Sequence, residues 1–240
     1  MTTATERQRD YVYVGNELDL FADAANWKRY WASQIGDFLG ARIAEVGAGI
    51  GTNVALLGKP GQEWTCVEPD PTLAARIEAR IRAREFSFPC RVTTGTCADL
   101  EIASYDSILY IDVLEHIADD RAEVTTAAQR LRPGGHLITL SPAHPYLYSP
   151  FDAAIGHHRR YTRKTILALT PTMLTPVRVR YLDAVGMMAS LANRLFLKSS
   201  QPKLSEIHLW DRCIVPCSRL IDPLIGHRAG RSILCVWRRF

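Results

Sequence analysis

Long apolar runs and metal-binding cysteine pairs are both missing from this chain of 240 residues. No stretch approaches the roughly 18 consecutive apolar residues that a membrane-spanning helix needs, so we expect no stable membrane insertion. The six cysteines include no C-x-x-C pair, and we interpret them as reduced thiols of a cytoplasmic protein with no metal site. The first residues, MTTATERQRDY, lack the apolar core of a signal peptide.

A strong excess of one charge is also missing. The chain carries 29 Lys and Arg against 25 Asp and Glu, which leaves a formal net charge of +4. Nucleic-acid-binding proteins usually concentrate basic residues on one face, whereas here they are scattered, so we expect no nucleic-acid partner. No internal repeat or low-complexity segment occurs. A hydrophobic fraction of 47% is typical of a globular protein with a buried core.

Segments with strand and helix patterns alternate along the middle of the chain. We expect a first helix over 18–38 and an irregular, partly helical insertion over 187–230. Strands are expected at 41–46, 64–70, 90–95, 105–112, 136–141, 177–185 and 232–237, with helices opening at 52, 71, 119 and 163. This order predicts a doubly wound α/β fold, with a ligand outside the carboxyl ends of its parallel strands.

The stretch EVGAGIG forms a glycine turn between a strand and a helix. Gly47, Gly49 and Gly51 follow the pattern G-x-G-x-G, and Thr52 stands where a dinucleotide fingerprint has its last glycine. Glu45 would repel a phosphate and suits a cationic ligand or an amino group. Glu68 ends the second strand, where a carboxylate can accept hydrogen bonds from both hydroxyls of a ribose. The alternative is a turn that only packs a helix on a strand.

Four motifs, in this order and spacing, resemble class I S-adenosylmethionine-dependent methyltransferases of the small-molecule type. They read IAEVGAGIGTNVALL, CVEPDP, YDSILYIDVLEHIADD and LRPGGHLITLSP. The resemblance implies a Rossmann-like, mostly parallel seven-stranded sheet whose last strand is antiparallel. It also implies S-adenosyl-L-methionine as cofactor. We expect one methyltransferase domain over 1–240, with a helical lid (1–39), a cofactor-binding core (40–142) and a substrate side (143–240).

The resemblance also assigns residues to the cofactor. They are Glu45, Gly47, Ala48, Gly49, Gly51, Glu68, Pro69, Asp70, Thr96, Cys97, Asp112, Val113 and His116. Family members often carry an acid after the third strand to meet the adenine amino group. Thr96 stands at that position here, with Cys97 next to it. Whether Asp99 replaces the acid stays open.

The segment SPAHPYLYSPFDAAIGHHRRYT, residues 141–162, is expected to face the acceptor. A metal site would need more ligands than His157 and His158. Adjacent side chains usually point apart, so these two histidines would not bind the same ion. A solvated basic face is one alternative. The other is an anion site in which Arg159 or Arg160 holds a carboxylate or phosphate in a fork, beside His158 and Tyr161. The candidates for a general base are His116, His144 and His158.

The acceptor is less well defined than the cofactor. Tyr11, Tyr13 and Trp27 are candidates for lining its pocket, or else they only pack the lid. We expect O-methylation at a carboxylate or hydroxyl of a small, possibly anionic acid. The apolar segment MMASLANRLFL would instead suit a lipid-like, sugar or polyketide acceptor. A non-catalytic binding module is a further alternative, and both a monomer and a homodimer are open.

Overall fold

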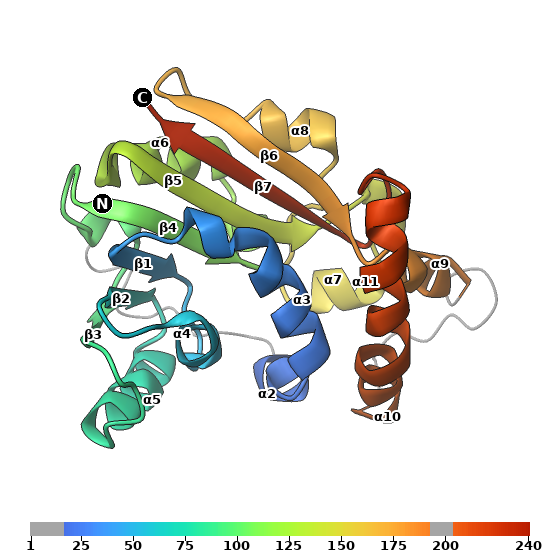
Figure 1. Cartoon of the computed structure of the whole chain (residues 1–240), viewed down its shortest axis with the longest axis horizontal. Helices are drawn as coiled ribbons and strands as arrows, with labels where there is room; N and C mark the ends of the chain where they lie inside the picture. The colour runs from blue at the N-terminus through green and yellow to red at the C-terminus, as the bar shows by residue number, and fades with distance from the viewer. Residues whose placement is uncertain (1–16, 193–203) are drawn as a thin grey trace.

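The computed structural model describes residues 17–192 and 204–240, and it contains a seven-stranded sheet (Figure 1). The strands are β1 (Arg42–Val46), β2 (Glu63–Glu68), β3 (Cys90–Thr94), β4 (Tyr105–Ile111), β5 (Leu131–Pro142), β6 (Leu174–Leu182) and β7 (Ser232–Arg239). Their order is β3-β2-β1-β4-β5-β7-β6, and β7 runs antiparallel to both of its neighbours. The remaining pairs are parallel, which confirms the predicted Rossmann-like sheet.

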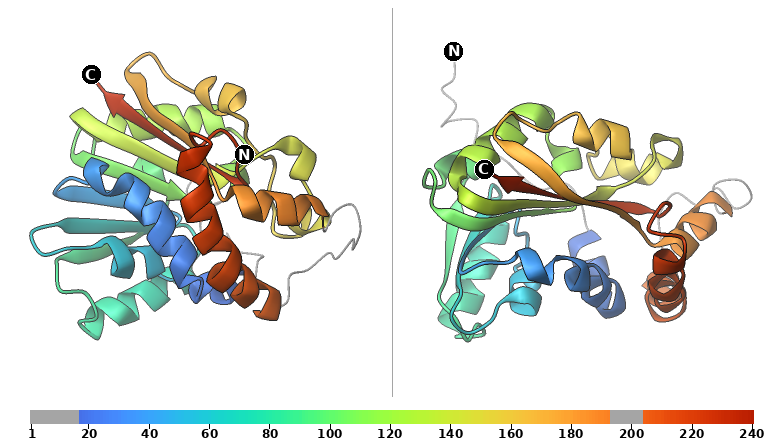
Figure 2. Two further views of the ribbon diagram at one scale, coloured as in Figure 1. Left: turned by 45° about the vertical axis from the view of Figure 1, so that its right-hand side comes forward. Right: turned by 45° about the horizontal axis from the view of Figure 1, so that its top comes forward.

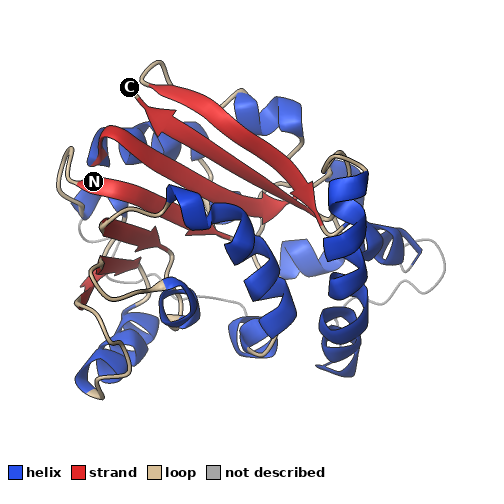
Figure 3. Cartoon of the chain, in the orientation of Figure 1, coloured by secondary structure: helices blue, strands red, loops and turns tan. Residues whose placement is uncertain are grey.

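Helices cover both faces of the sheet (Figures 2 and 3). They are α2 (Glu17–Ala22), α3 (Ala25–Ile35), α4 (Thr52–Leu57), α5 (Pro71–Arg82), α6 (Asp120–Arg130), α7 (Pro150–Ala154), α8 (Arg163–Leu167), α9 (Ala184–Ala192), α10 (Leu204–Leu209) and α11 (Val215–Leu224). One buried apolar cluster joins the sheet to α6 and α8. A second cluster, on the other face, joins it to α3, α4 and α5.

Several predicted boundaries differ from the observed ones. The helix expected over 18–38 is divided into α2, α3 and a short 3-10 turn. Strand β5 begins at Leu131 instead of His136, because its pairing with β4 continues across a register shift near Tyr105. Strand β6 ends at Leu182 instead of 185, because Asp183 adopts a positive φ of 69° and its carboxylate accepts a hydrogen bond from Gly186 N.

The connection from β2 to α5 shows how local sequence sets one edge of the site. Asp70 caps α5, since its carboxylate accepts hydrogen bonds from the backbone N–H groups of Thr72 and Leu73 at 2.7 and 3.3 Å. Pro71 then occupies the first helical position, where no backbone N–H is needed. The helix therefore starts directly after β2 and keeps the end of that strand in place.

The amino-terminal helix α3 is bonded to the carboxyl-terminal helices. The buried Asp222 of α11 accepts hydrogen bonds from the Tyr30 hydroxyl at 2.7 Å and from the N–H groups of Asp183 and Ala184 at 2.7 and 3.0 Å. Asp211 accepts one from Trp27 N at 2.8 Å. These contacts place α3 and α10–α11 together beside the carboxyl ends of the strands. Within 17–192 and 204–240, no helix is long and apolar enough to cross a membrane.

Candidate active site

A cavity of about 980 Å³ lies at the carboxyl ends of the parallel strands. Its floor contains residues that directly follow β1, β2 and β4, among them Gly47, Pro69 and Asp112. Strand order reverses between β1 and β4, and this is where a doubly wound sheet binds its ligand. The cavity is therefore at the position that the alternation of strands and helices predicts.

The glycine turn is shaped by close contacts with its surroundings. Gly47 has a φ of +68°, and a Cβ there would lie 2.6 Å from Cγ2 of Val113, so no larger residue fits. The N–H groups of Gly47 and Ala48 donate to Val67 O at 2.8 and 3.2 Å. Gly47, Ala48 and Gly49 line the cavity, whereas Gly51 is the cap residue of α4 and does not line it.

Glu68 lies at the edge of the cavity with its carboxylate held on both sides. Gly49 N donates to Oε2 at 2.8 Å, and Asp70 N donates to Oε1 at 3.0 Å. The residue is only 3% exposed, and this burial raises the pKa of the carboxyl group. Each oxygen keeps a second lone pair, so the group can still accept hydrogen bonds from a pair of ligand hydroxyls. Pro69 lines the cavity beside it, and Asp70 does not.

Glu45 lies behind the cavity wall and not in its lining. Asn53, which does line the cavity, donates from Nδ2 to Glu45 Oε1 at 2.7 Å, while Oε2 has no hydrogen-bond partner within residues 17–192 and 204–240. Burial raises the pKa of Glu45 to about 8, so the carboxyl group is mostly protonated at pH 7. Its observed contact is to Asn53, which it positions at the wall.

The stretch after β3 does not line the cavity. Thr96 N donates to Asp99 Oδ2 at 2.8 Å and closes a capping box over a short turn. Cys97 is fully buried in the core. Neither Thr96, Cys97 nor Asp99 is among the lining residues. The structure therefore does not bring these three residues to the part of the cavity next to Glu68.

The turn after β4 adds a strained acidic residue. Asp112 has a positive φ of 55°, a conformation that costs free energy in a non-glycine residue and is frequent at functional sites. Burial raises the pKa of Asp112 to about 6, and the nearby charges of His157, Arg231 and Arg160 limit the rise. Asp112 and Val113 line the cavity together with Glu115 and His116.

Comparison with known proteins agrees with this geometry. Residues 44–137 match the family model described as a methyltransferase domain. The matched residues run from β1 into β5, so this part of the chain is similar to a methyltransferase domain.

Individual relatives are similar over part of their length. The demethylmenaquinone methyltransferase of Tropheryma whipplei is 29% identical over 135 residues, which cover 55% of this chain and 54% of the relative. A ubiquinone biosynthesis O-methyltransferase of Alkalilimnicola ehrlichii is 31% identical over 112 residues, 45% of this chain and 44% of the relative. The chain thus spans about half the length of the curated relatives it matches.

A solved structure shows the same fold over nearly the whole chain. The geranyl diphosphate methyltransferase in complex with GPP and sinefungin aligns with a TM-score of 0.63 and 17% identity. The alignment covers 96% of this chain and 85% of the other chain. At this identity the likeness establishes the fold.

The histidine-rich loop over 141–162 brings different residues to the cavity from those expected. His144 is stacked between the rings of Tyr146 and Tyr181, with centroid distances of 5.0 and 4.8 Å, and lies outside the lining. Burial lowers the pKa of His144. His158 is exposed and does not line the cavity either, whereas its neighbour His157 does.

The two arginines of the loop are already paired within the protein. Arg159 forms an ion pair with Asp120 at 2.6 Å and does not line the cavity. Tyr161 also bonds to Asp120, through its hydroxyl at 2.8 Å. Arg160 lines the cavity, but its guanidinium forms a bidentate ion pair with Asp152, with Nε–Oδ1 and Nη2–Oδ2 distances of 2.8 and 3.0 Å. The structure therefore brings Arg160 alone to the cavity, with its charge compensated.

The helical side of the cavity is largely apolar. Trp27 of α3 lines it and packs against Trp210, with ring centroids 5.7 Å apart. Tyr11 and Tyr13 lie outside the described residues. Arg231 also lines the cavity, with its guanidinium carbon 4.3 Å from the centroid of the Trp210 ring. The sequence did not identify Arg231 as a cavity residue, because it follows the helical insertion and belongs to no motif. It did not single out His157, because a pair of adjacent histidines does not show which of the two faces the cavity.

Proposed function

We propose that this chain transfers a methyl group from S-adenosylmethionine to an oxygen atom of a small molecule. The observation that carries the proposal is Glu68, a buried carboxylate fixed by Gly49 N at the edge of a cavity at the switch point of the sheet. A carboxylate in this position suits the two hydroxyls of a ribose. The match of residues 44–137 to a methyltransferase domain supports the same cofactor.

The residues of the cavity fit the cofactor in shape and charge. Glu68 would hold the ribose, and Pro69 would lie against the adenosine. The glycine turn leaves room for the amino-acid part, and Asp112 supplies a negative charge for its ammonium group. When bound, S-adenosylmethionine supplies a methyl group whose carbon an acceptor oxygen can attack, with the positively charged sulfur as the leaving group. The task of the protein is to orient the acceptor oxygen and to exclude water.

The rest of the cavity favours a neutral acceptor with an apolar body. The acidic lining residues are Glu68, Asp112, Glu115, Asp152 and Glu206, and the basic ones are Lys28, Arg160 and Arg231. Because the guanidinium of Arg160 is paired with Asp152, the lining residues that the structure describes supply no excess positive charge for an anionic acceptor. Aromatic side chains such as Phe21, Trp27 and Phe151 supply an apolar surface. We therefore favour a hydroxyl acceptor over a small carboxylic acid.

Calorimetry with S-adenosylhomocysteine tests the cofactor proposal. We expect one binding site, and we expect Glu68→Gln to raise the Kd about 10- to 100-fold, because charge-assisted hydrogen bonds contribute about 1.5–3 kcal/mol each. Glu63→Gln is the matched control, since Glu63 lies on the same strand with its side chain 64% exposed. A folded chain that binds no S-adenosylhomocysteine would contradict the proposal.

A panel of acceptors with labelled cofactor tests the second half of the proposal. Phenols and other hydroxyl compounds with apolar bodies should be methylated in preference to small carboxylic acids and amines. Preference for carboxylic acids would instead support the small-acid acceptor. Binding of S-adenosylhomocysteine without turnover on any acceptor would favour a non-catalytic binding module.

A further inference from the structure

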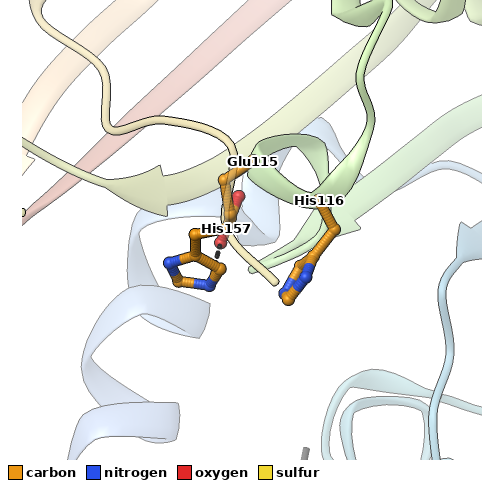
Figure 4. Close-up of side chains that lie close together, drawn as sticks. All are labelled: Glu115, His116 and His157. Atoms are coloured by element: carbon orange, nitrogen blue, oxygen red, sulfur yellow. Dashed lines mark ion pairs between the residues drawn. The ribbon is translucent and has the colours of Figure 1, made fainter. Parts of the chain in front are cut away.

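Three side chains from two distant segments meet at one side of the cavity (Figure 4). Glu115 and His116 belong to the short turn after β4, and His157 belongs to the loop after α7. One potential ligand atom from each lies within 4.8 Å of the other two. Glu115 Oε1 and His157 Nε2 are 3.8 Å apart, and the two imidazole rings meet edge to face with centroids 4.5 Å apart.

The carboxylate of Glu115 is buried with weak pairing: an ion pair with His157 Nε2 at 3.8 Å, and interactions with the Ser141 side chain and the charge of Arg160. The residue is 0% exposed, and neither oxygen makes a hydrogen bond of normal geometry among the described residues. Burying a charged group with such weak pairing costs free energy. The side chain nonetheless lies against the cavity instead of being replaced by an apolar one, which is the arrangement expected of a ligand for a cation.

His157 is oriented as metal-binding histidines usually are. Its Nδ1 lies 2.9 Å from Oδ1 of Asp152, so the other ring nitrogen, Nε2, faces Glu115. Asp152 is itself held by the fork of Arg160 and by the hydroxyl of Ser149. A second carboxylate behind a histidine fixes its ring and raises its basicity toward a metal. On the other side, His116 interacts with the backbone of Gly156.

We propose that Glu115, His116 and His157 form a binding site for one divalent transition-metal ion. Two imidazoles and one carboxylate suit Zn²⁺ or Fe²⁺, whereas Mg²⁺ and Ca²⁺ prefer oxygen ligands alone. Metal–ligand bonds of about 2.0–2.2 Å require the three ligand atoms to move closer together. We expect rotation of the His116 ring, which lies to one side of Glu115 and His157 in Figure 4, to supply this movement.

The ion would keep open coordination positions toward the cavity, because only three protein ligands surround it. The role of the site rests on the proposed function: an acceptor hydroxyl bound there would be held in place, and its pKa would be lowered. Glu115 and His116 lie only three and four residues after Asp112, which we place at the amino-acid part of the cofactor. The site thereby joins the cofactor end of the cavity to its acceptor end.

The test uses the full chain without a histidine tag, stripped with a chelator. Zn²⁺ binding is measured by calorimetry and Co²⁺ binding by visible absorption. We expect one ion per chain, and we expect Glu115→Gln, His116→Gln and His157→Gln each to weaken binding at least tenfold. Glutamine keeps a polar side chain, and an unchanged Tm shows that each variant is folded.

Cys213 and Cys217 provide the matched control. Both are exposed and lie four residues apart, so they are a competing site for a soft metal. The double variant Cys213→Ser, Cys217→Ser should retain the ion. A thiolate-to-cobalt absorption band, loss of the ion in this double variant, or unchanged affinity in the three glutamine variants would each overturn the proposal.

The metal and cofactor tests fail independently. A chain that binds S-adenosylhomocysteine and no metal refutes the metal site and leaves the proposed function standing. A chain that binds the metal and no S-adenosylhomocysteine refutes the proposed function and leaves the metal site standing. Increased turnover of a hydroxyl acceptor on adding Zn²⁺ or Fe²⁺, lost in His157→Gln, would support the role of the ion. Metal binding with no effect on turnover would refute that role.

Discussion

The protonation of Glu45 should make the stability of the whole domain depend on pH. Burial raises the pKa of this carboxyl from about 4.5 in the unfolded chain to about 8 in the folded protein. The folded state therefore binds the proton more tightly than the unfolded state does. The stabilisation is complete below pH 4.5 and is lost as the pH rises through 8.

The size of the effect follows from the two pKa values. Each pKa unit corresponds to about 1.36 kcal/mol, so the loss between pH 4.5 and pH 9 is about 5 kcal/mol. Glu45→Gln removes this loss of stability at high pH, because an amide imitates the protonated acid and its oxygen can still accept the hydrogen bond from Asn53. At pH 9 the free energy of unfolding of Glu45→Gln should exceed that of the parent by several kcal/mol.

Thermal unfolding of both proteins from pH 5 to pH 9 checks this prediction. The difference in Tm should be small at pH 5 and about 10 °C or more at pH 9, with Glu45→Gln the more stable protein. Comparing the two proteins cancels the titration of all other groups. Glu63→Gln, on an exposed position of β2, should follow the parent at every pH. Parallel curves for Glu45→Gln and the parent would refute the assignment of a protonated Glu45.

Two further changes test the glycine turn of the site and the buried acceptor on α11. Gly47→Ala should unfold at lower temperature and lose affinity for S-adenosylhomocysteine, because its Cβ would overlap Val113 at a positive φ; Gly36→Ala, where a Cβ meets nothing within 4 Å, should be neutral in the same assays. Asp222→Ala should lower the free energy of unfolding by about 3 kcal/mol or more in denaturant titrations, since it leaves three buried donors without an acceptor, whereas Tyr30→Phe should cost only about 1 kcal/mol. Equal losses in those last two proteins would show that Asp222 does not act as a shared acceptor.

The sheet and the part of the cavity proposed to hold the cofactor could be predicted because their signals are local. Alternating strand and helix patterns predict parallel pairing, and parallel pairing brings the strand ends together at one edge. The glycine turn after β1 and Glu68 at the end of β2 therefore meet at the switch point of the sheet. The burial of Glu45 behind Asn53 was not predictable, because it depends on how α4 packs against β1.

The sequence by itself thus determined the fold, the position of the cavity and the carboxylate at its edge. Tertiary structure alone decided which polar side chains of the loop over 141–162 reach that cavity. His157 faces it and His158 does not, although the two are adjacent. Arg159 and Arg160 have their charges compensated by Asp120 and Asp152. The physical reason is that side-chain direction and ion pairing there depend on contacts between distant segments, such as Glu115 with His157, which local periodicity does not encode.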